Sequence, residues 1–303
     1  MNYYLGIDGG GTKTKVIIID ANEKVVFENE AGPSSVDTVS LIEAYENIKA
    51  ALNPFIINHP QITFKALFAG LGGIVFAETK NKIIEKLKKL KGISNSTKIT
   101  VENDMHNALY SGYLSDEGVV LIAGTGMVAF GRDLTGKEAK CGGWGYQEGE
   151  LGSAYHLGKS AINYLIRAYD KRLPLDEFAK EVAFEVGLKK ATDIIKISLE
   201  LHTQRTKVAS LAPIVNKYAN LNHPYALKII DCATSELALA VKGVIEQLTL
   251  KEKRLVVVGS LGNAPGIFKE KLHQKIILDY PNIKIISPLV DPAFAAALMA
   301  KRL

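Results

Sequence analysis

The sequence predicts an α/β protein built from two related lobes, each opening with a strand, a glycine-rich turn and a second strand. The first such segment spans residues 3–20, where two apolar runs flank Gly9-Gly10-Gly11-Thr12. The second spans residues 119–130, where apolar runs flank Gly124-Thr125-Gly126. Two glycine turns in equivalent contexts indicate an internal duplication. The length of 303 residues agrees with two lobes, since domains commonly have about 100–200 residues.

The first lobe is expected to begin with an antiparallel meander and to continue as a parallel sheet. Residues 3–7, 15–20 and 24–28 carry apolar runs typical of strands, joined by short turns. Parallel pairing is excluded there, because a parallel crossover needs about a dozen residues or more. Helical spacing then alternates with short apolar runs, which indicates βαβ units. The predicted helices are 41–55, 77–90 and one from about Met105, and the predicted strands are 64–69 and 99–101.

The second lobe is expected to be largely helical after its opening hairpin. Residues 149–250 have helical patterns with breaks near Pro174, Gly187, Thr203 and His223-Pro224. Residues 255–258 and 283–286 return to strand, and a helix from Pro292 closes the chain. The predicted first lobe comprises residues 1–112 and 291–303, and the second comprises residues 113–290.

Composition excludes several classes of protein. The hydrophobic fraction of 47% and the charged fraction of 23% are those of a globular chain. The net charge of +5 is mild and comes with no basic stripe, so no nucleic-acid partner is expected. Cys141 and Cys232 are too few for a disulfide scaffold or a four-cysteine zinc site. No basic leader precedes an apolar run, and the longest nearly apolar run is about half a membrane span. We therefore expect a cytoplasmic protein with no membrane partner.

The glycine turns are candidate phosphate sites, because bare backbone N–H groups can approach an anion closely. A dinucleotide-binding fingerprint is excluded, since a strand and not a helix follows the first turn. A P-loop is excluded as well, because Thr12 occupies the lysine position. The alternative to a phosphate site is a tight hairpin that binds no ligand. Two equivalent turns favour a pair of hairpins that hold the phosphates of a nucleotide.

Four segments resemble one known family. Residues 5–14 (LGIDGGGTKT) are similar to the first phosphate motif of the actin-like ATPases, in the N-acetylglucosamine kinase or BadF/BadG/BcrA/BcrD ATPase branch. Residues 121–126 resemble its second phosphate motif, and residues 256–260 resemble the strand that leads to the adenosine site. Residues 141–155 resemble its sugar segment. The resemblance implies two ribonuclease H-like lobes with an interlobe cleft, ATP and Mg²⁺ as cofactors, and an amino sugar as the small-molecule partner. It also implies phosphoryl transfer to the sugar 6-hydroxyl, with N-acetylglucosamine as the expected substrate.

The resemblance assigns roles around the nucleotide. It places phosphates at Gly9, Gly10, Gly11 and Thr12 and at Gly124, Thr125 and Gly126, with adenosine near Gly259 and Ser260. Lys13 either neutralises phosphate charge or points to solvent. Asp8, at the end of the first strand, would hold Mg²⁺ through water, because this ion sheds its hydration shell reluctantly. The alternative interpretation of Asp8 is an aspartate that only stabilises the turn.

The candidate catalytic base is Asp104, which follows a predicted strand and begins a helix. Asn103-Asp104 could equally be an ordinary helix N-cap pair. The resemblance favours catalysis, because the catalytic aspartate of the family occupies the same strand-to-helix turn. A base there would take the proton of the sugar hydroxyl as the γ-phosphoryl group arrives. The candidate sugar-binding residues are Ser35, Gly70, Asn103, Asp104, Gly143, Trp144 and Glu150.

The sugar segment departs from the family pattern, which leaves the identity of the sugar open. Ser35 stands where the family usually has asparagine, and Gly72 stands where relatives carry aspartate. One carboxylate of a family pair is Glu150, and Leu151 replaces the other. Hydroxyl specificity depends on such buried polar partners. Glucosamine, N-acetylmuramate and a broad range of hexoses are the alternatives. Trp144 is either an apolar wall of the sugar pocket or a packing anchor.

Two further classes remain as alternatives at this stage. A dehydratase-activating ATPase of the same superfamily holds an iron–sulfur cluster between two subunits with two cysteines each, and this chain has two cysteines. The other alternative is a nucleotide-binding sensor without turnover, against which the intact Asp8 and Asp104 argue. A homodimer is expected from the resemblance alone.

Overall fold

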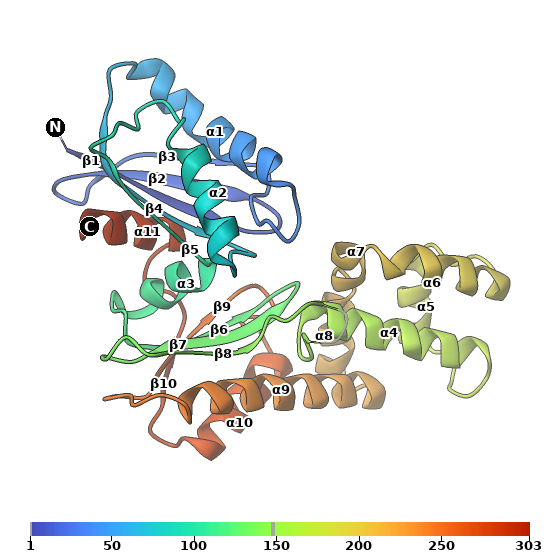
Figure 1. Ribbon diagram of the computed structural model, residues 1–303. Helices are drawn as coiled ribbons and strands as arrows, with labels where there is room; N and C mark the ends of the chain where they lie inside the picture. Colours follow the sequence, from blue (N-terminus) through green and yellow to red (C-terminus); the bar gives the residue numbers. More distant parts are fainter. Residues whose placement is uncertain (1, 147–148) are drawn as a thin grey trace. The chain divides into compact units, whose positions relative to one another are not determined.

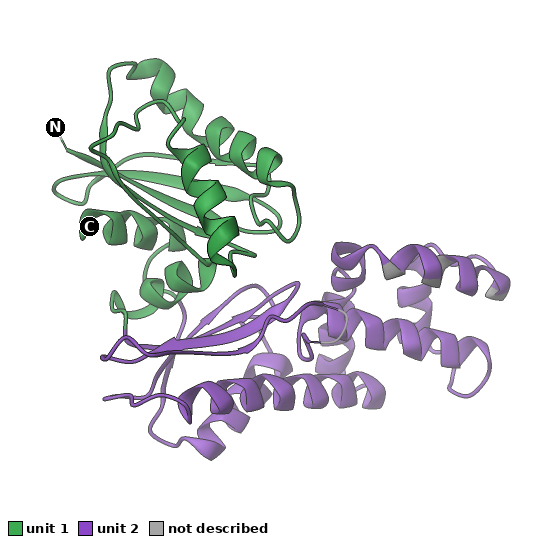
Figure 2. Cartoon of the chain, in the orientation of Figure 1, with its two compact units in different colours: residues 1–116, 288–303 green, residues 117–287 purple. Residues whose placement is uncertain are grey.

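The computed structural model describes residues 2–146 and 149–303 (Figure 1). The chain divides into two compact units, Met1–Asp116 with Pro288–Leu303, and Glu117–Ser287 (Figure 2). Each unit contains a five-stranded mixed sheet with helices packed on it. The predicted α/β class with two related sheets is therefore confirmed. Among the described residues, no helix is both long and apolar enough to cross a membrane.

The first sheet combines an antiparallel meander with parallel strands, as predicted. The order β3-β2-β1-β4-β5 pairs β1 with β2 and β2 with β3 in antiparallel register. β1 pairs with β4, and β4 with β5, in parallel register. The carboxyl ends of β1, β4 and β5 therefore meet at one edge of the sheet. The strands are β1 (Tyr3–Gly9), β2 (Thr14–Asp20), β3 (Val25–Ala31), β4 (Phe64–Leu71) and β5 (Lys98–Glu102).

Helices cover both faces of the first sheet, which is why its central strands are apolar on both sides. Ile18 of β2 belongs to the core beneath α1 (Leu41–Asn58) and α2 (Ala77–Leu87), whereas Ile17 packs with α11 (Pro292–Lys301). The α11 backbone approaches β1 closely at Gly6, where a Cβ would lie 2.2 Å from Ala293 O. A fourth helix, α3 (Asp104–Tyr113), follows β5 directly.

The second sheet repeats the topology of the first. Its strand order is β8-β7-β6-β9-β10. Numbered along the chain within each unit, both sheets have the order 3-2-1-4-5. The first three strands are antiparallel, and β6, β9 and β10 are parallel. The duplication predicted from the two glycine turns is thus present in the strand order. The strands are β6 (Gly118–Ala123), β7 (Met127–Arg132), β8 (Glu138–Gly142), β9 (Arg254–Val258) and β10 (Lys284–Ile286).

The long helical region of the second unit breaks near the predicted positions. Its core gathers apolar side chains from β6, α4 and α9 among others, and α9 packs on the sheet beside α10 (Figure 1). The helices are α4 (Ala154–Tyr169), α5 (Glu177–Glu185), α6 (Ile194–His202), α7 (Arg205–Ala209), α8 (Ala212–Asn220), α9 (Pro224–Ile245) and α10 (Ile267–Asp279), with a 3₁₀ turn at Ala191–Asp193.

The sequence analysis missed two elements, β8 and α10. The β8 sequence EAKCG contains no β-branched or aromatic residue, and the strand lies at the sheet edge. In α10, Phe268, Leu272 and Ile276 face the core, but the exposed Ile277 and Leu278 obscure the helical period. Gly266 at its N-terminus also provides no side-chain cap. Tertiary contacts, and not local signals, define both elements.

Candidate active site

Asp104, the predicted catalytic base, and Asp8, the predicted Mg²⁺ residue, lie at the same edge of the first sheet. Asp8 is near the carboxyl end of β1, and Asp104 is the first residue of α3, which begins immediately after β5. Both side chains are partly buried. The negative charge of Asp8 acts on Asp104 closely enough to raise its pKa. The fold thus brings together two acids that are far apart in sequence.

The environment of these acids shifts both pKa values upward. Burial, followed by the charges of Asp8 and Asp37, raises the pKa of Asp104 to about 7, although the N–H groups of Met105 and Asp104 itself act in the opposite direction. Burial is also the main reason that the pKa of Asp8 rises to about 6, with the charge of Asp291 adding to it. A carboxylate that titrates near neutral pH is suited to accept a proton during a reaction.

Asn107 is a site residue that the sequence analysis missed. Its side chain is fully buried, and its Nδ2 donates to Asp8 Oδ1 at 2.8 Å and to Ile7 O at 3.1 Å. Asn107 lies one helical turn after Asp104 on α3, so this turn carries one acid and the side chain that contacts the other. A Cβ at Gly70 would lie 2.3 Å from the Asn107 amide. Gly70, a predicted sugar residue, therefore provides the space in which Asn107 reaches Asp8.

The predicted sugar residue Ser35 lies beside Asp104. A Cβ built on Gly72 would be 2.6 Å from Ser35 Oγ and 3.4 Å from Asp104 Oδ2. Val36 N donates to Gly72 O, which ties this loop to the end of β4. Asn103 acts as the N-cap of α3, because its Oδ1 accepts from Met105 N at 3.2 Å. The capping interpretation and the catalytic interpretation of the Asn103-Asp104 pair are therefore compatible.

The two glycine turns are closed in the same way and leave similar backbone groups available. Gly10 N donates to Lys13 O, and Gly124 N donates to Gly126 O, each at 2.9 Å. Within the described residues, the N–H groups of Gly11, Thr12 and Thr125 have no hydrogen bond. These N–H groups can therefore donate to an anion without loss of an internal hydrogen bond.

Nothing within the described chain requires glycine at positions 10 and 124. A Cβ at Gly124 would meet nothing within 4 Å, and one at Gly10 would be in ordinary contact with Lys13 O at 3.7 Å. Neither residue has a left-handed φ. By contrast, a Cβ at Gly9 would lie 2.1 Å from Ser34 Oγ. Open backbone at Gly10 and Gly124 fits a ligand that approaches the main chain.

The predicted adenosine residues lie next to the second glycine turn. Gly259 directly follows β9 and has a φ of 98°, and a Cβ there would lie 2.4 Å from Ala123 O. Gly262 N donates to the same carbonyl at 3.0 Å, one residue before Gly124. Ser260 is exposed beside Gly259. The fold therefore brings the second phosphate motif and the adenosine motif together.

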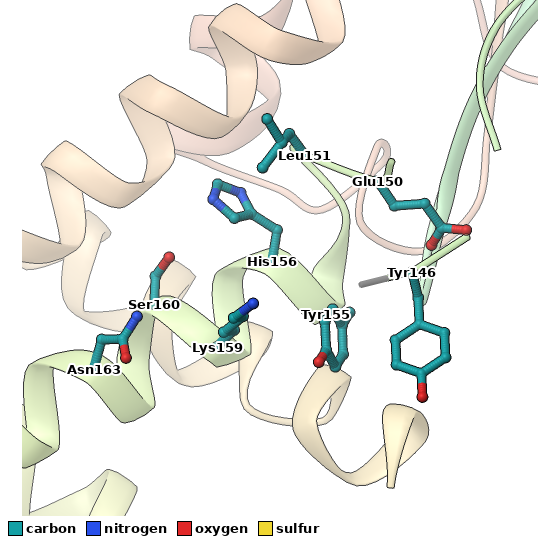
Figure 3. Close-up of a pocket in the computed structure, with 8 residues that line it drawn as sticks. All are labelled: Tyr146, Glu150, Leu151, Tyr155, His156, Lys159, Ser160 and Asn163. Carbon is teal, nitrogen blue, oxygen red and sulfur yellow. The ribbon is translucent and has the colours of Figure 1, made fainter. Parts of the chain in front are cut away.

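Glu150 is buried against the second glycine turn and is paired with a residue that the sequence analysis missed. Its Oε2 accepts from Arg205 Nη2 at 2.6 Å, and Arg205 comes from the short helix α7. A Cβ at Gly126 would overlap both groups. Glu150 and Tyr146 also line one side of a hollow of about 240 Å³, whereas the polar face of α4 lines the other side (Figure 3).

Three other candidate residues are exposed or partly exposed. Trp144 is 72% exposed, with Lys140 Nζ located 4.0 Å from its ring centre, so it does not anchor the core. Gly143 has a φ of 65°, and its carbonyl accepts from Lys140 Nζ. Lys13 is exposed and pairs with Glu30 at 2.5 Å. The alternative in which Lys13 points to solvent therefore describes this structure.

Comparison with known proteins identifies the family. The model of the BadF/BadG/BcrA/BcrD ATPase family matches residues 5–300, so the chain belongs to this family. An N-acetylmuramic acid/N-acetylglucosamine kinase of Clostridium acetobutylicum is 31% identical, with 99% of each chain covered. An N-acetyl-D-glucosamine kinase of Dictyostelium discoideum is 29% identical, with 98% of this chain and 97% of the relative covered.

Solved structures support the same fold. A protein of Chromobacterium violaceum, proposed to be an N-acetylglucosamine kinase, matches with a TM-score of 0.79 at 19% identity and 99% coverage of both chains. A glucokinase of the ROK family from Streptomyces griseus matches with a TM-score of 0.57 at 14% identity over the full length of both chains. These matches confirm the predicted fold of the actin-like ATPases. The kinase names of the curated relatives agree with an ATP-dependent phosphotransferase.

Proposed function

We propose that this chain is an ATP-dependent sugar kinase that transfers the γ-phosphoryl group to the 6-hydroxyl of an amino sugar. The observation that carries the proposal is the pair of partly buried acids at one sheet edge, with the pKa of Asp104 raised to about 7. Phosphoryl transfer to an alcohol needs a base for the attacking hydroxyl, and Asp104 is suited to that role. Two curated relatives with kinase names support the reaction class.

Asp104 would act as the base at the sugar hydroxyl. Its carboxylate accepts the hydroxyl proton as the sugar oxygen attacks the γ-phosphorus and the bond to ADP breaks. Ser35, adjacent to Asp104 across Gly72, would hold a neighbouring sugar hydroxyl. Asn107 would keep the Asp8 carboxylate oriented through its 2.8 Å hydrogen bond. The N–H groups of Gly11, Thr12 and Thr125 would bind phosphate oxygens.

Asp8 is suited to hold Mg²⁺ through water. Its carboxylate is partly buried and has a pKa of about 6, so an adjacent cation would stabilise the ionised form. Within the described residues, no group of three or more acidic, histidine or cysteine side chains could enclose a metal ion. Mg²⁺ usually keeps several waters and is bound by one or two carboxylates and by substrate phosphates. When bound, the ion would neutralise phosphate charge.

N-acetylglucosamine is the proposed substrate, with N-acetylmuramate as a second acceptor. The names of the curated relatives support both sugars. Ser35 and Gly72 replace a larger amide and a carboxylate of the family pattern, so fewer fixed polar groups surround Asp104. A site with fewer such partners discriminates less between substituents on the sugar.

The experiment is ADP release with Mg-ATP across a panel of sugars. The panel contains N-acetylglucosamine, N-acetylmuramate, N-acetylmannosamine, glucosamine and glucose. We expect strong stimulation by N-acetylglucosamine and N-acetylmuramate and weak stimulation by glucose. ATP turnover that is indifferent to every sugar would contradict the proposal, and iron content would then be measured.

A further inference from the structure

The guanidinium of Arg205 lies directly against the second glycine turn. A Cβ built on Gly126 would be 2.2 Å from Arg205 Nη2 and 2.5 Å from Glu150 Oε2. Gly126 does not have a left-handed φ, so the turn conformation does not require glycine there. The space that the Glu150–Arg205 pair occupies is what requires it. A positive charge is thereby held beside one of the two turns that are proposed to bind phosphate.

Arg205 has more donors than its protein partners use. Nη2 donates to Glu150 Oε2 at 2.6 Å, and the guanidinium lies 5.3 Å from the Tyr146 ring centre. A guanidinium has five N–H donors. The Nε–H of Arg205 is buried and has no acceptor in the part of the chain that the structure describes. An unpaired buried donor is costly, and an anionic ligand bound by the guanidinium would offset that cost.

Phosphoryl transfer is assisted by cationic side chains as well as by a metal ion, and Arg205 provides such a charge beside Gly126. Charge builds on the oxygens of the transferred phosphoryl group, and it must be neutralised. Arg205 carries a planar fork of donors that matches the oxygens of a phosphoryl group.

We propose that Arg205 is a further catalytic residue, and this proposal rests on the proposed kinase function. Its guanidinium contacts the γ-phosphoryl group beside Gly126 and stabilises the charge on the phosphoryl oxygens during transfer. The bond from phosphorus to ADP breaks, the bond to the sugar oxygen forms, and the hydroxyl proton passes to the base of the proposed reaction. Arg205 exchanges no proton. Glu150 is a positioning residue that holds the guanidinium by the 2.6 Å ion pair.

The test compares Arg205→Ala with Arg172→Ala and with the wild-type protein. Arg172 is a matched control, because it is an exposed arginine of the same unit that pairs with Asp170. Sugar-dependent ADP release by the wild type tests the proposed function. The ratio of the variant kcat to the wild-type kcat tests the role of Arg205. Affinities for ADP and for a non-hydrolysable ATP analogue are measured by calorimetry. Guanidinium ion is then added to the alanine variant.

Arg205→Ala should lower kcat by about 10²–10³-fold, the usual effect of removing one donor at a developing charge. It should remove the preference for the ATP analogue over ADP, leave the sugar KM little changed, and regain activity with added guanidinium. Wild-type kcat, or an equal loss of affinity for both nucleotides, would overturn the proposal. If the alanine variant does not fold, Arg205→Gln, which can still donate to Glu150, is measured instead. An unchanged preference for the ATP analogue in that variant would also overturn the proposal.

Discussion

At the scale of single residues, the proposed phosphoryl transfer depends on the protonation of Asp104. A base must be ionised to accept a proton, and the pKa of Asp104 in the free protein is about 7. We therefore predict that kcat/KM rises with pH and levels off above about 7, because kcat/KM reports the free enzyme. A pH profile of sugar-dependent ADP release measures this. A profile that is flat between pH 5 and 8 would contradict the assignment of the base.

The variant Asp104→Asn separates binding from catalysis. It should keep affinity for sugar and nucleotide by calorimetry and lose turnover by about 10²–10⁴-fold, the usual contribution of a general base. Asp8→Asn provides a comparison, since the effect there should depend on the Mg²⁺ concentration. Turnover in Asp104→Asn comparable to the wild type would refute the role of Asp104.

The same variant should increase stability at high pH. The pKa of Asp104 is raised from 3.8 to about 7 on folding, so the folded protein holds this proton more tightly than the unfolded chain. The contribution of Asp104 to stability is therefore greatest below pH 4 and is lost as the pH rises to about 7. The Tm of Asp104→Asn should exceed that of the wild type at pH 8, and the difference should shrink near pH 4. A lower Tm at pH 8 would show that the carboxylate stabilises the fold.

The sequence could identify Asp8 because it lies in the first glycine motif. It could identify Asp104 because this residue follows a predicted strand at the turn where the resemblance places the catalytic aspartate of the family. Asn107 and Arg205 could not be found in this way. Asn107 is one polar residue inside a helix, and its contact with Asp8 spans 99 positions of the chain. Arg205 begins a five-residue helix, 55 positions after the glutamate that it pairs with. Only the folded chain reveals such contacts.

At the scale of elements, the two glycine turns make a matched test. Gly124 has open space where a Cβ would lie, so Gly124→Ala should fold with a Tm close to that of the wild type. If ATP approaches this backbone, the variant should lose roughly tenfold or more in affinity, as expected for a lost hydrogen bond to a charged group.

Gly9→Ala is the control for the first turn. Its Cβ would lie 2.1 Å from Ser34 Oγ and 2.5 Å from Leu71, so this variant should lose about 1–3 kcal/mol of stability. Thermal unfolding and nucleotide titration distinguish the two effects. Unchanged ATP affinity in a folded Gly124→Ala variant would argue against a phosphate at the second turn.

A helix or strand can be predicted from the sequence when its own residues carry the pattern that forms it. The strands β1, β2 and β6 are buried and aliphatic, and the sequence pattern is sufficient to place them. β8 has no such pattern, because an edge strand needs fewer apolar residues. α10 is defined by its contacts with α9 and not by a cap or a clear apolar stripe.

At the scale of the whole molecule, the duplication explains why two phosphate motifs occur in one chain. Each sheet has the same strand order, and each places its glycine turn between its first two strands. The sequence predicted this repeat because the two turns are recognisable. It could not specify the sugar, since specificity depends on a few side chains gathered by the fold.

The most direct measurement is the fate of the γ-phosphoryl group, followed by phosphorus and proton NMR in a reaction with Mg-ATP and N-acetylglucosamine. A sugar kinase that uses Asp104 as base should convert ATP to ADP and N-acetylglucosamine 6-phosphate in equal amounts, with little inorganic phosphate. Addition of N-acetylmuramate instead should give its 6-phosphate. Release of inorganic phosphate with no phosphorylated sugar, at a rate that does not depend on the sugar, would contradict the account.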